Sequence, residues 1–162
     1  SIQQKKYSTK RTTVPDELVS LILEKVYKYD ASKRANIQKS YIDQKQVEQK
    51  VVGDLLQKYI AKEGFKYGYY DASGEILRTI DIIKKGKNGK WISFQIKNSD
   101  NTKNSTVSKG TETEIIKWER RKSKTGETNW NRFPDEELRL KLSEKGFHDF
   151  IWKYFGLEDT DN

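Results

Sequence analysis

The stretch TIDIIKKGKNGKWISFQIKN, residues 79–98, predicts the centre of the fold. Residues 76–83 are rich in branched apolar side chains, and residues 91–96 alternate between polar and apolar ones, which is typical of β-strands. The glycine-containing segment 86–89 supplies a turn between them. We therefore expect an antiparallel hairpin at the heart of an α/β (α+β) domain.

Two side chains of this hairpin are suited to catalysis, Asp81 and Lys97. Asp81 interrupts a run of isoleucines, where a carboxylate is unfavourable unless it is paired or binds a cation. Because side chains alternate along a strand, Lys97 projects beside Gln95, on the face opposite Phe94 and Ile96. Such a pair suits metal-dependent hydrolysis, in which the carboxylate holds the cation and the amine activates water. A structural ion pair is the alternative interpretation.

The length of the hairpin turn decides whether Asp81 joins this group. A five-residue turn pairs Asp81 with Gln95. A two-residue turn at Asn88 and Gly89 shifts the pairing by one residue and puts Asp81 on the other face of the sheet. The sequence leaves both registers open.

A third acid is expected on a preceding helix, predicted from about residue 38 to residue 61. Val52, Leu55 and Tyr59 share one face of this helix because offsets of three and four residues return to the same side. At about 100° per residue, Glu48 lies within roughly 40° of these three side chains. Glu48 is therefore a candidate metal ligand, with a buried salt bridge as the alternative.

Other helices are predicted towards both ends of the chain. The sequence PDE at residues 15–17 and again at 134–136 favours a helix start. Residues 147–155 form an aromatic helix that Gly156 closes, and His148 within it is assigned to packing. Residues 115–121, IIKWERR, are interpreted as helical, with Trp118 in the core.

The net charge of +8 is concentrated in one region. Between Lys84 and Lys124 there are twelve basic residues and four acidic ones, an excess equal to the charge of the whole chain. Clustered lysines and arginines favour binding to a polyanion, because phosphate contacts release counterions. A solvated basic surface is the alternative explanation.

Side chains suited to base edges and phosphates lie within and just after the polar stretch 98–113. The DNA-binding candidates are Asn98, Ser99, Asp100, Asn101, Lys103, Asn104, Ser105, Lys109, Lys117, Arg120 and Arg121. A polar loop without this function would have a similar composition.

Several classes of protein are disfavoured by composition. The chain has no cysteine, which excludes disulfides and thiol chemistry, and its single histidine argues against zinc and histidine-based nucleases. No apolar run approaches the roughly 20 residues of a membrane span. We expect a cytoplasmic protein with no membrane partner and no organic cofactor. The predicted organisation is an arm at 1–14, one nuclease domain at 15–156 and an acidic tail at 157–162.

The pattern of Asp81 followed by Gln95-x-Lys97 on a hairpin resembles the PD-(D/E)XK nuclease superfamily. The run QIKNSDNTKNSTVSKGTETEIIKWERRKSKTGETNW, residues 95–130, resembles type II restriction endonucleases related to SinI. The close part of the resemblance spans residues 80–130. It implies a restriction-endonuclease-like mixed central sheet with an antiparallel hairpin, flanked by helices.

The resemblance also implies roles for individual residues. Asp81 is the metal-binding acid, Lys97 the catalytic lysine, and Gln95 stands where Glu or Asp is usual. Ile80 replaces the usual proline. We expect Mg²⁺, with Mn²⁺ as a substitute, to be held by Asp81 with Glu48 and the carbonyl of Ile96.

The expected function is Mg²⁺-dependent, site-specific cleavage of double-stranded DNA by a homodimer. One alternative is a structure-specific or repair nuclease on the same fold. Another is a non-catalytic nucleic-acid-binding module, which predicts steeply salt-dependent binding without a need for Mg²⁺.

Overall fold

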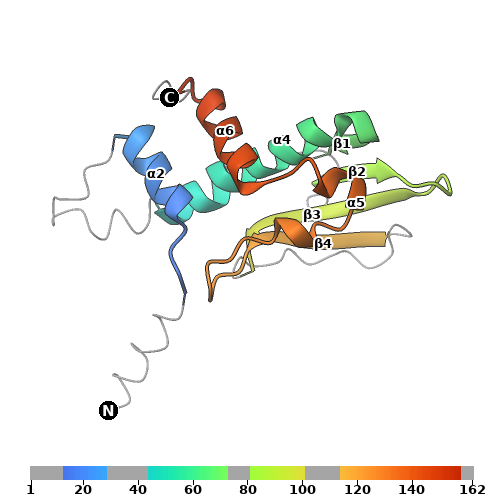
Figure 1. Cartoon of the computed structure of the whole chain (residues 1–162), viewed down its shortest axis with the longest axis horizontal. Coiled ribbons are helices and arrows are strands. Elements are labelled where there is room, and N and C mark those ends of the chain that lie inside the picture. Colours follow the sequence, from blue (N-terminus) through green and yellow to red (C-terminus); the bar gives the residue numbers. More distant parts are fainter. Residues whose placement is uncertain (1–12, 29–43, 73–80, 101–113, 158–162) are drawn as a thin grey trace, which may run out of the picture.

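A computed structural model describes residues 13–28, 44–72, 81–100 and 114–157 of the chain. Its sheet has the order β1-β2-β3-β4, in which the first three strands are antiparallel and β4 runs parallel to β3. The strands are β1 (Tyr69–Asp71), β2 (Ile82–Lys85), β3 (Trp91–Ser99) and β4 (Glu114–Arg121). This mixed sheet with its helices confirms the predicted fold class (Figure 1).

The hairpin between β2 and β3 has the five-residue turn. Lys85 pairs with Trp91 and Ile82 pairs with Phe94, as the five-residue turn requires. Within the turn, the N–H of Gly86 donates to the carbonyl of Lys90 at 2.7 Å. Gly89 has a φ of 79°, a left-handed conformation that glycine adopts without strain. The paired residues therefore have the register of the five-residue turn, and Asp81 lies just before β2, where its N–H bonds to the carbonyl of Phe94.

The segment interpreted as helical at residues 115–121 is a strand, so that prediction was wrong. In β4, Trp118 is 3% exposed and Arg120 2% exposed, and both project to the helix-covered face as strand alternation requires. The inward-facing arginine obscured the alternation, because a buried charge in a strand cannot be expected unless its partners are known. Trp118 lies in the core as expected.

Helices pack along one side of the sheet (Figure 1). The described part of the long one starts with the α-helical residues 44–46, passes through η3 (Val47–Val52) and continues as α4 (Gly53–Gly64), which packs on β1 and β3. Next to it lie α2 (Glu17–Lys25) and α6 (Glu144–Tyr154), while the single turn η4 (Phe65–Tyr67) leads into β1. The short helices η5 (Trp130–Arg132) and α5 (Glu136–Arg139) follow β4 in the chain. No helix among the described residues is long and apolar enough to cross a membrane.

Helix starts follow the predicted capping chemistry. The carboxylate of Asp16 accepts from the N–H of Leu18 at the start of α2, and Asp135 accepts from the first-turn amides of α5. The hydroxyl of Ser143 caps α6 by accepting from the N–H of Gly146, just before the aromatic run begins at Phe147. Gly156, with a φ of 71°, follows α6 at the predicted end. The two PDE sequences are thus confirmed as helix starts.

The core lies between the long helix and the sheet. Val52, Leu55 and Tyr59 are buried on the predicted helix face, opposite the strand residues Phe94 and Ile96. Burying each large apolar side chain contributes roughly 1.5–3 kcal/mol, so this face holds the long helix on the sheet. The helix carries Glu48 at its beginning and so fixes the height of that carboxylate above the sheet.

One feature of the long helix was not predicted from sequence. Residues 47–52 form a π-helix, in which the N–H of Gly53 bonds to the carbonyl of Glu48, five residues earlier. A wider turn changes the rotation of the residues before it relative to those after it, and such turns are frequent at functional sites. Glu48 is half-buried as a result of this geometry.

Candidate active site

Asp81 is fixed between β1 and β3 by main-chain hydrogen bonds. Its N–H donates to the carbonyl of Phe94 at 3.0 Å, and its carbonyl accepts from Ala72 at 2.8 Å. Its carboxylate oxygen Oδ2 accepts from the N–H of Ile96 at 2.8 Å. The carboxylate therefore lies against β3, one residue before Lys97.

The surroundings of Asp81 disfavour its negative charge. Burial raises the pKa of the carboxyl group, the N–H of Ile96 lowers it, the charge of Asp71 raises it, and Lys97 lowers it, which together give about 6. A carboxylate whose pKa is raised in this way is typical of functional sites. A cation placed beside Asp81 and Asp71 would relieve the repulsion between them and favour the ionised form.

Lys97 is half-buried in the same region and faces Glu119 across the parallel pair of strands. Burial and the neighbouring charge of Lys117 lower the pKa of its amine, while Asp81 and Glu119 raise it by smaller amounts. A lowered pKa increases the fraction of neutral amine, the form that accepts a proton from water. The structure thus brings Asp81 and Lys97 together, as the sequence predicted.

Gln95 is 3% exposed and lies on the same face of β3 as Lys97, beside Lys117 of β4. Its amide carries no charge, so its oxygen is a weaker cation ligand than a carboxylate. Burial restricts the side chain to few rotamers, which suits an orienting role next to Asp81.

The oxygen donors around Asp81 fit a hard divalent cation. The set consists of the Asp81 carboxylate, the neighbouring Asp71 carboxylate and the carbonyl of Ile96. The N–H and C=O of one strand residue point to the same neighbouring strand, so the Ile96 carbonyl lies on the edge where its N–H meets Asp81. Oxygen ligands of this kind suit Mg²⁺ and Mn²⁺, which complete their coordination with water. Within the described residues, no three acids or histidines are grouped as a metal cluster.

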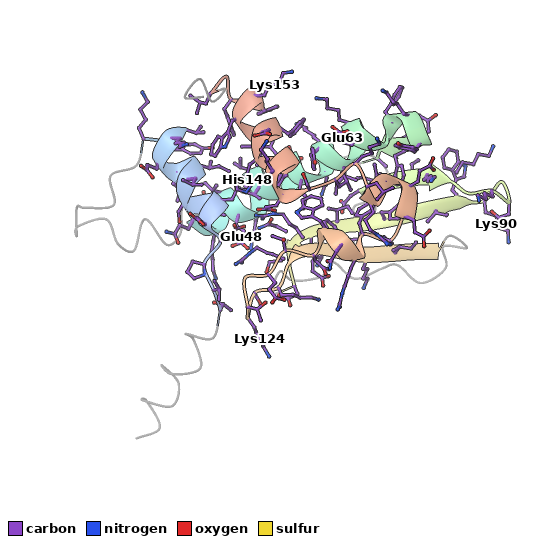
Figure 2. The ribbon with its side chains drawn as sticks, viewed as in Figure 1. Glu48, Glu63, Lys90, Lys124, His148 and Lys153 are labelled. Carbon is purple, nitrogen blue, oxygen red and sulfur yellow. The ribbon has the colours of Figure 1, made fainter. Side chains whose placement is uncertain are left out.

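Glu48 lies near the same end of the sheet but among different neighbours. Burial and the charge of Asp16 raise the pKa of its carboxyl group, whereas Arg121, a hydrogen bond with Asn98 and the charge of Arg120 lower it. In Figure 2, Glu48 lies beside α2, and Lys90 in the hairpin turn is at the opposite end of the molecule. The structure therefore places Glu48 over the end of β3 and next to Asn98, on the helix-covered side.

Arg120, a predicted DNA contact, lies inside the protein. Its Nη1 is 2.9 Å from Asp16 and its Nη2 is 2.7 Å from Glu144, and only 2% of the residue is exposed. This arrangement joins α2, β4 and α6 at one guanidinium group. The prediction of DNA contact by Arg120 is therefore corrected to a structural role, because the guanidinium has no exposed surface to offer a phosphate.

Other candidates at the ends of β3 and β4 are also held by the protein itself. Arg121 is buried and donates to the carbonyl of Val14 at 2.9 Å. Asn98 and Ser99 are buried, which does not support their predicted contact with base edges. Asp100 is exposed, and its carboxylate accepts from the N–H of Ser123 at 2.9 Å.

Among the described candidates, Lys117 is the basic residue that remains on the surface, as the acidic Asp100 does. Lys117 is exposed on β4 and close enough to Lys97 to affect its pKa. The remaining candidates lie outside the described residues; these are Asn101, Lys103, Asn104, Ser105 and Lys109.

Three acids near the site were not predicted from sequence. Asp71 lies at the end of β1 and influences Asp81, while Asp16 and Glu144 bind Arg120. Asp16 and Glu144 each stand at a helix start, where capping explained them sufficiently. A signal for Glu144 did exist, since an inward-facing arginine in β4 requires buried acids elsewhere in the chain.

Comparison with known proteins covers nearly the whole chain. Residues 2–157 match the family model described as SinI restriction endonuclease. This chain belongs to the SinI restriction endonuclease family. Asp81, Gln95 and Lys97, and the run that resembled this family, all lie within the matched region.

Two relatives in the SinI family are named type II restriction enzymes. Eco47I of Escherichia coli is 37% identical over 148 residues, which cover 90% of this chain and 64% of the relative. SinI of Salmonella infantis is 35% identical over 151 residues, which cover 92% of this chain and 65% of the relative. The chain thus spans slightly less than two thirds of the length of these relatives.

Proposed function

We propose that this chain is a divalent-metal-dependent nuclease that hydrolyses phosphodiester bonds at specific sites in double-stranded DNA. The observation that carries the proposal is the 2.8 Å hydrogen bond from the Ile96 N–H to the Asp81 carboxylate. This bond holds an acid beside Lys97 in a family whose named relatives are type II restriction enzymes.

The chain's residues divide the chemistry between them. Asp81, with the carbonyl of Ile96 and the carboxylate of Asp71 as further oxygen donors, would hold Mg²⁺ or, as a substitute, Mn²⁺. Glu48 lies among Asp16, Asn98 and Arg121 on the helix-covered side and is left out of this set. When bound, the cation supplies positive charge that stabilises the phosphate oxygens and acidifies water. Gln95 fixes the position of the Asp81 side chain from the same face of the sheet.

Lys97 acts on the attacking water. Its lowered pKa makes neutral amine available to take a proton from water as the oxygen approaches phosphorus. The attack breaks the bond to the 3′ oxygen and leaves a 5′-phosphate and a 3′-hydroxyl. Lys117, exposed beside this site, would contact the DNA backbone, and the basic candidates between residues 101 and 109 would contact the groove.

Site-specific cleavage of a palindrome requires two equivalent active sites. A homodimer with twofold symmetry supplies them, because the symmetry of the protein then matches that of the DNA. We include this dimer in the proposal.

The test is cleavage of plasmid and phage DNA by the purified chain, with Mg²⁺ or with EDTA. The comparison uses wild type, Lys97→Ala and the surface control Lys141→Ala, whose lysine is exposed after α5. We expect discrete fragments that need Mg²⁺, and at least a 100-fold lower rate for Lys97→Ala alone.

Two results would count against this function. Uncut DNA that is bound with a steep salt dependence would identify a binding module. Cleavage confined to four-way or mismatched DNA would identify a structure-specific nuclease instead of a site-specific one.

A further inference from the structure

Asn98 directly follows Lys97, and its side chain is held by several partners. Its Nδ2 donates to Asp16 at 2.9 Å, its Oδ1 accepts from Nη1 of Arg120, and it hydrogen-bonds to Glu48. Only 5% of the residue is exposed. Both ends of the amide are therefore occupied by protein groups.

The partners of Asn98 are themselves fixed. Nε and Nη2 of Arg120 donate to the two carboxylate oxygens of Glu144, at 2.9 Å and 2.7 Å. Glu144 also accepts from the indole of Trp130 at 2.9 Å and lies 2.8 Å from His148. Paired, charge-assisted hydrogen bonds of this kind hold a guanidinium in one orientation. Arg120 is thus a rigid support for Asn98.

Consecutive residues of a strand project to opposite faces of the sheet. Lys97 projects towards the face of Asp81, and Asn98 projects towards the helices that carry Asp16 and Glu48. An anchor on Asn98 therefore fixes the backbone from which Lys97 leaves the strand. The anchor matters here because β3 ends at Ser99, where a strand without support would fray.

We propose that Asn98 is a positioning residue that holds Lys97 beside Asp81 and sets Glu48 above the same strand. Asn98 is thus assigned to the support of the site in place of the base-reading role expected from sequence. The proposal rests on the proposed nuclease function. A displacement of about 1 Å at a catalytic group can lower a rate roughly 100-fold, so loss of this anchor should reduce turnover strongly.

The first experiment compares Asn98→Ala with the matched control Glu144→Gln. Both variants weaken the support of Arg120, but only the first removes a contact to β3. We expect Asn98→Ala to lower kcat by roughly 10- to 100-fold and to change KM for DNA by less than about twofold. Glu144→Gln should keep kcat within about threefold of wild type at a temperature where both variants are folded.

A second pair of variants distinguishes a loss of positioning from a loss of folding. Asn98→Asp places a second carboxylate next to that of Asp16, so this variant should lose activity. The double variant Asp16→Asn with Asn98→Asp restores one amide and one carboxylate, with their positions exchanged. Asparagine also caps helices well, so α2 keeps its start. We expect the double variant to recover kcat to within a few-fold of wild type. A double variant as inactive as Asn98→Asp would overturn the proposal.

Amide hydrogen exchange supplies a readout that does not need activity. Asn98→Ala should speed exchange in residues 95–99, and Glu144→Gln should not. If wild type cleaves no DNA, the proposed function fails while exchange still tests the anchor. Unchanged exchange in Asn98→Ala, or an equal fall of kcat in Glu144→Gln, would assign Asn98 to general stability alone. A higher KM with unchanged kcat in Asn98→Ala would restore the role in DNA contact.

Discussion

Arg120 and Asp16 stand 104 residues apart in the sequence and form a buried ion pair with a separation of 2.9 Å between Nη1 and Oδ2. The pair links strand β4 to the cap of helix α2. Both groups also contact Asn98, so the pair lies directly behind the strand that carries Lys97. Its integrity bears on stability and on the geometry of the candidate active site.

Arg120→Met should destabilise the protein by about 3–5 kcal/mol, because Asp16 and Glu144 are left buried without their cation. Arg120→Lys should recover little, since a single ammonium group cannot serve two carboxylates and an amide as the planar guanidinium does. Urea denaturation at pH 7 measures both values. The exposed Arg132→Met provides the control, with an expected change below about 0.5 kcal/mol. A loss below about 1 kcal/mol for Arg120→Met would contradict the assignment of this arginine to the core.

Lowering the pH should destabilise the folded protein through the protonation of Asp16 and Glu144. Burial alone would raise the pKa of each carboxyl group, but the charge and hydrogen bonds of Arg120 outweigh it and hold both pKa values below their usual range. A lowered folded-state pKa gives stability that is present above the unfolded pKa of about 4 and lost as the pH falls towards the folded value. In urea denaturation, the midpoint urea concentration of wild type should therefore decrease as the pH is lowered below about 5.

The control for acid weakening is Glu144→Gln. This variant should be less stable than wild type at pH 7, and the difference should shrink steadily as the pH falls below about 4, because Glu144 of wild type then takes up a proton on unfolding. An equal difference between the two proteins above and below about pH 4 would disprove this assignment.

Asp81→Asn should abolish cleavage and yet stabilise the metal-free protein. Burial is the main reason that the pKa of Asp81 rises to about 6, with the charge of Asp71 adding to it. Stability from a raised carboxyl pKa is present at low pH and is lost as the pH rises through about 6. Asparagine keeps the acceptor for the Ile96 N–H without the charge.

Thermal unfolding in EDTA checks this prediction. At pH 8 the variant should exceed wild type by an amount on the order of 1 kcal/mol, and at about pH 4 or below the two should nearly agree. A variant that is less stable than wild type at pH 8 would show that the charge of Asp81 is compensated within the protein.

Lys117→Gln should alter the pH dependence of cleavage. The charge of Lys117 helps burial to lower the pKa of Lys97, so its removal lets that pKa rise. If neutral Lys97 takes the proton from water, the rate of the variant should reach its plateau at a higher pH than that of wild type. Single-turnover rates between pH 6 and 10 measure the shift. Lys141→Gln is the control, because Lys141 is exposed after α5 and is not among the charges that act on Lys97. A rate that is lower by the same factor at every pH would mean that Lys117 acts only in DNA binding.

Much of this structure could be predicted from local sequence patterns. The two PDE sequences gave helix starts, alternation gave β3, and Asp81 and Lys97 came together as the hairpin predicted. The hairpin register depends on the length of the turn, which Gly86 and Gly89, three residues apart, left ambiguous. Once that length is known, the pairing of Ile82 with Phe94 follows.

Long-range pairing explains the errors. Arg120 was assigned to DNA because a strand arginine next to a second arginine resembles a basic surface. Its partner acids lie 104 residues before it and 24 residues after it, in helices whose packing cannot be read locally. The π-helix at residues 47–52 likewise depends on how the long helix packs.

The guanidinium of Arg120 ties the first described helix to the last. A growing chain that has not yet made residues 144–154 leaves the buried charge of Arg120 only partly satisfied, and contacts between residues so far apart in sequence form slowly. The hairpin with Asp81 and Lys97 is synthesised well before that helix. We therefore expect the nascent chain to remain unfolded on the ribosome until α6 emerges, so that Lys97 reaches its place only when synthesis of this region is complete.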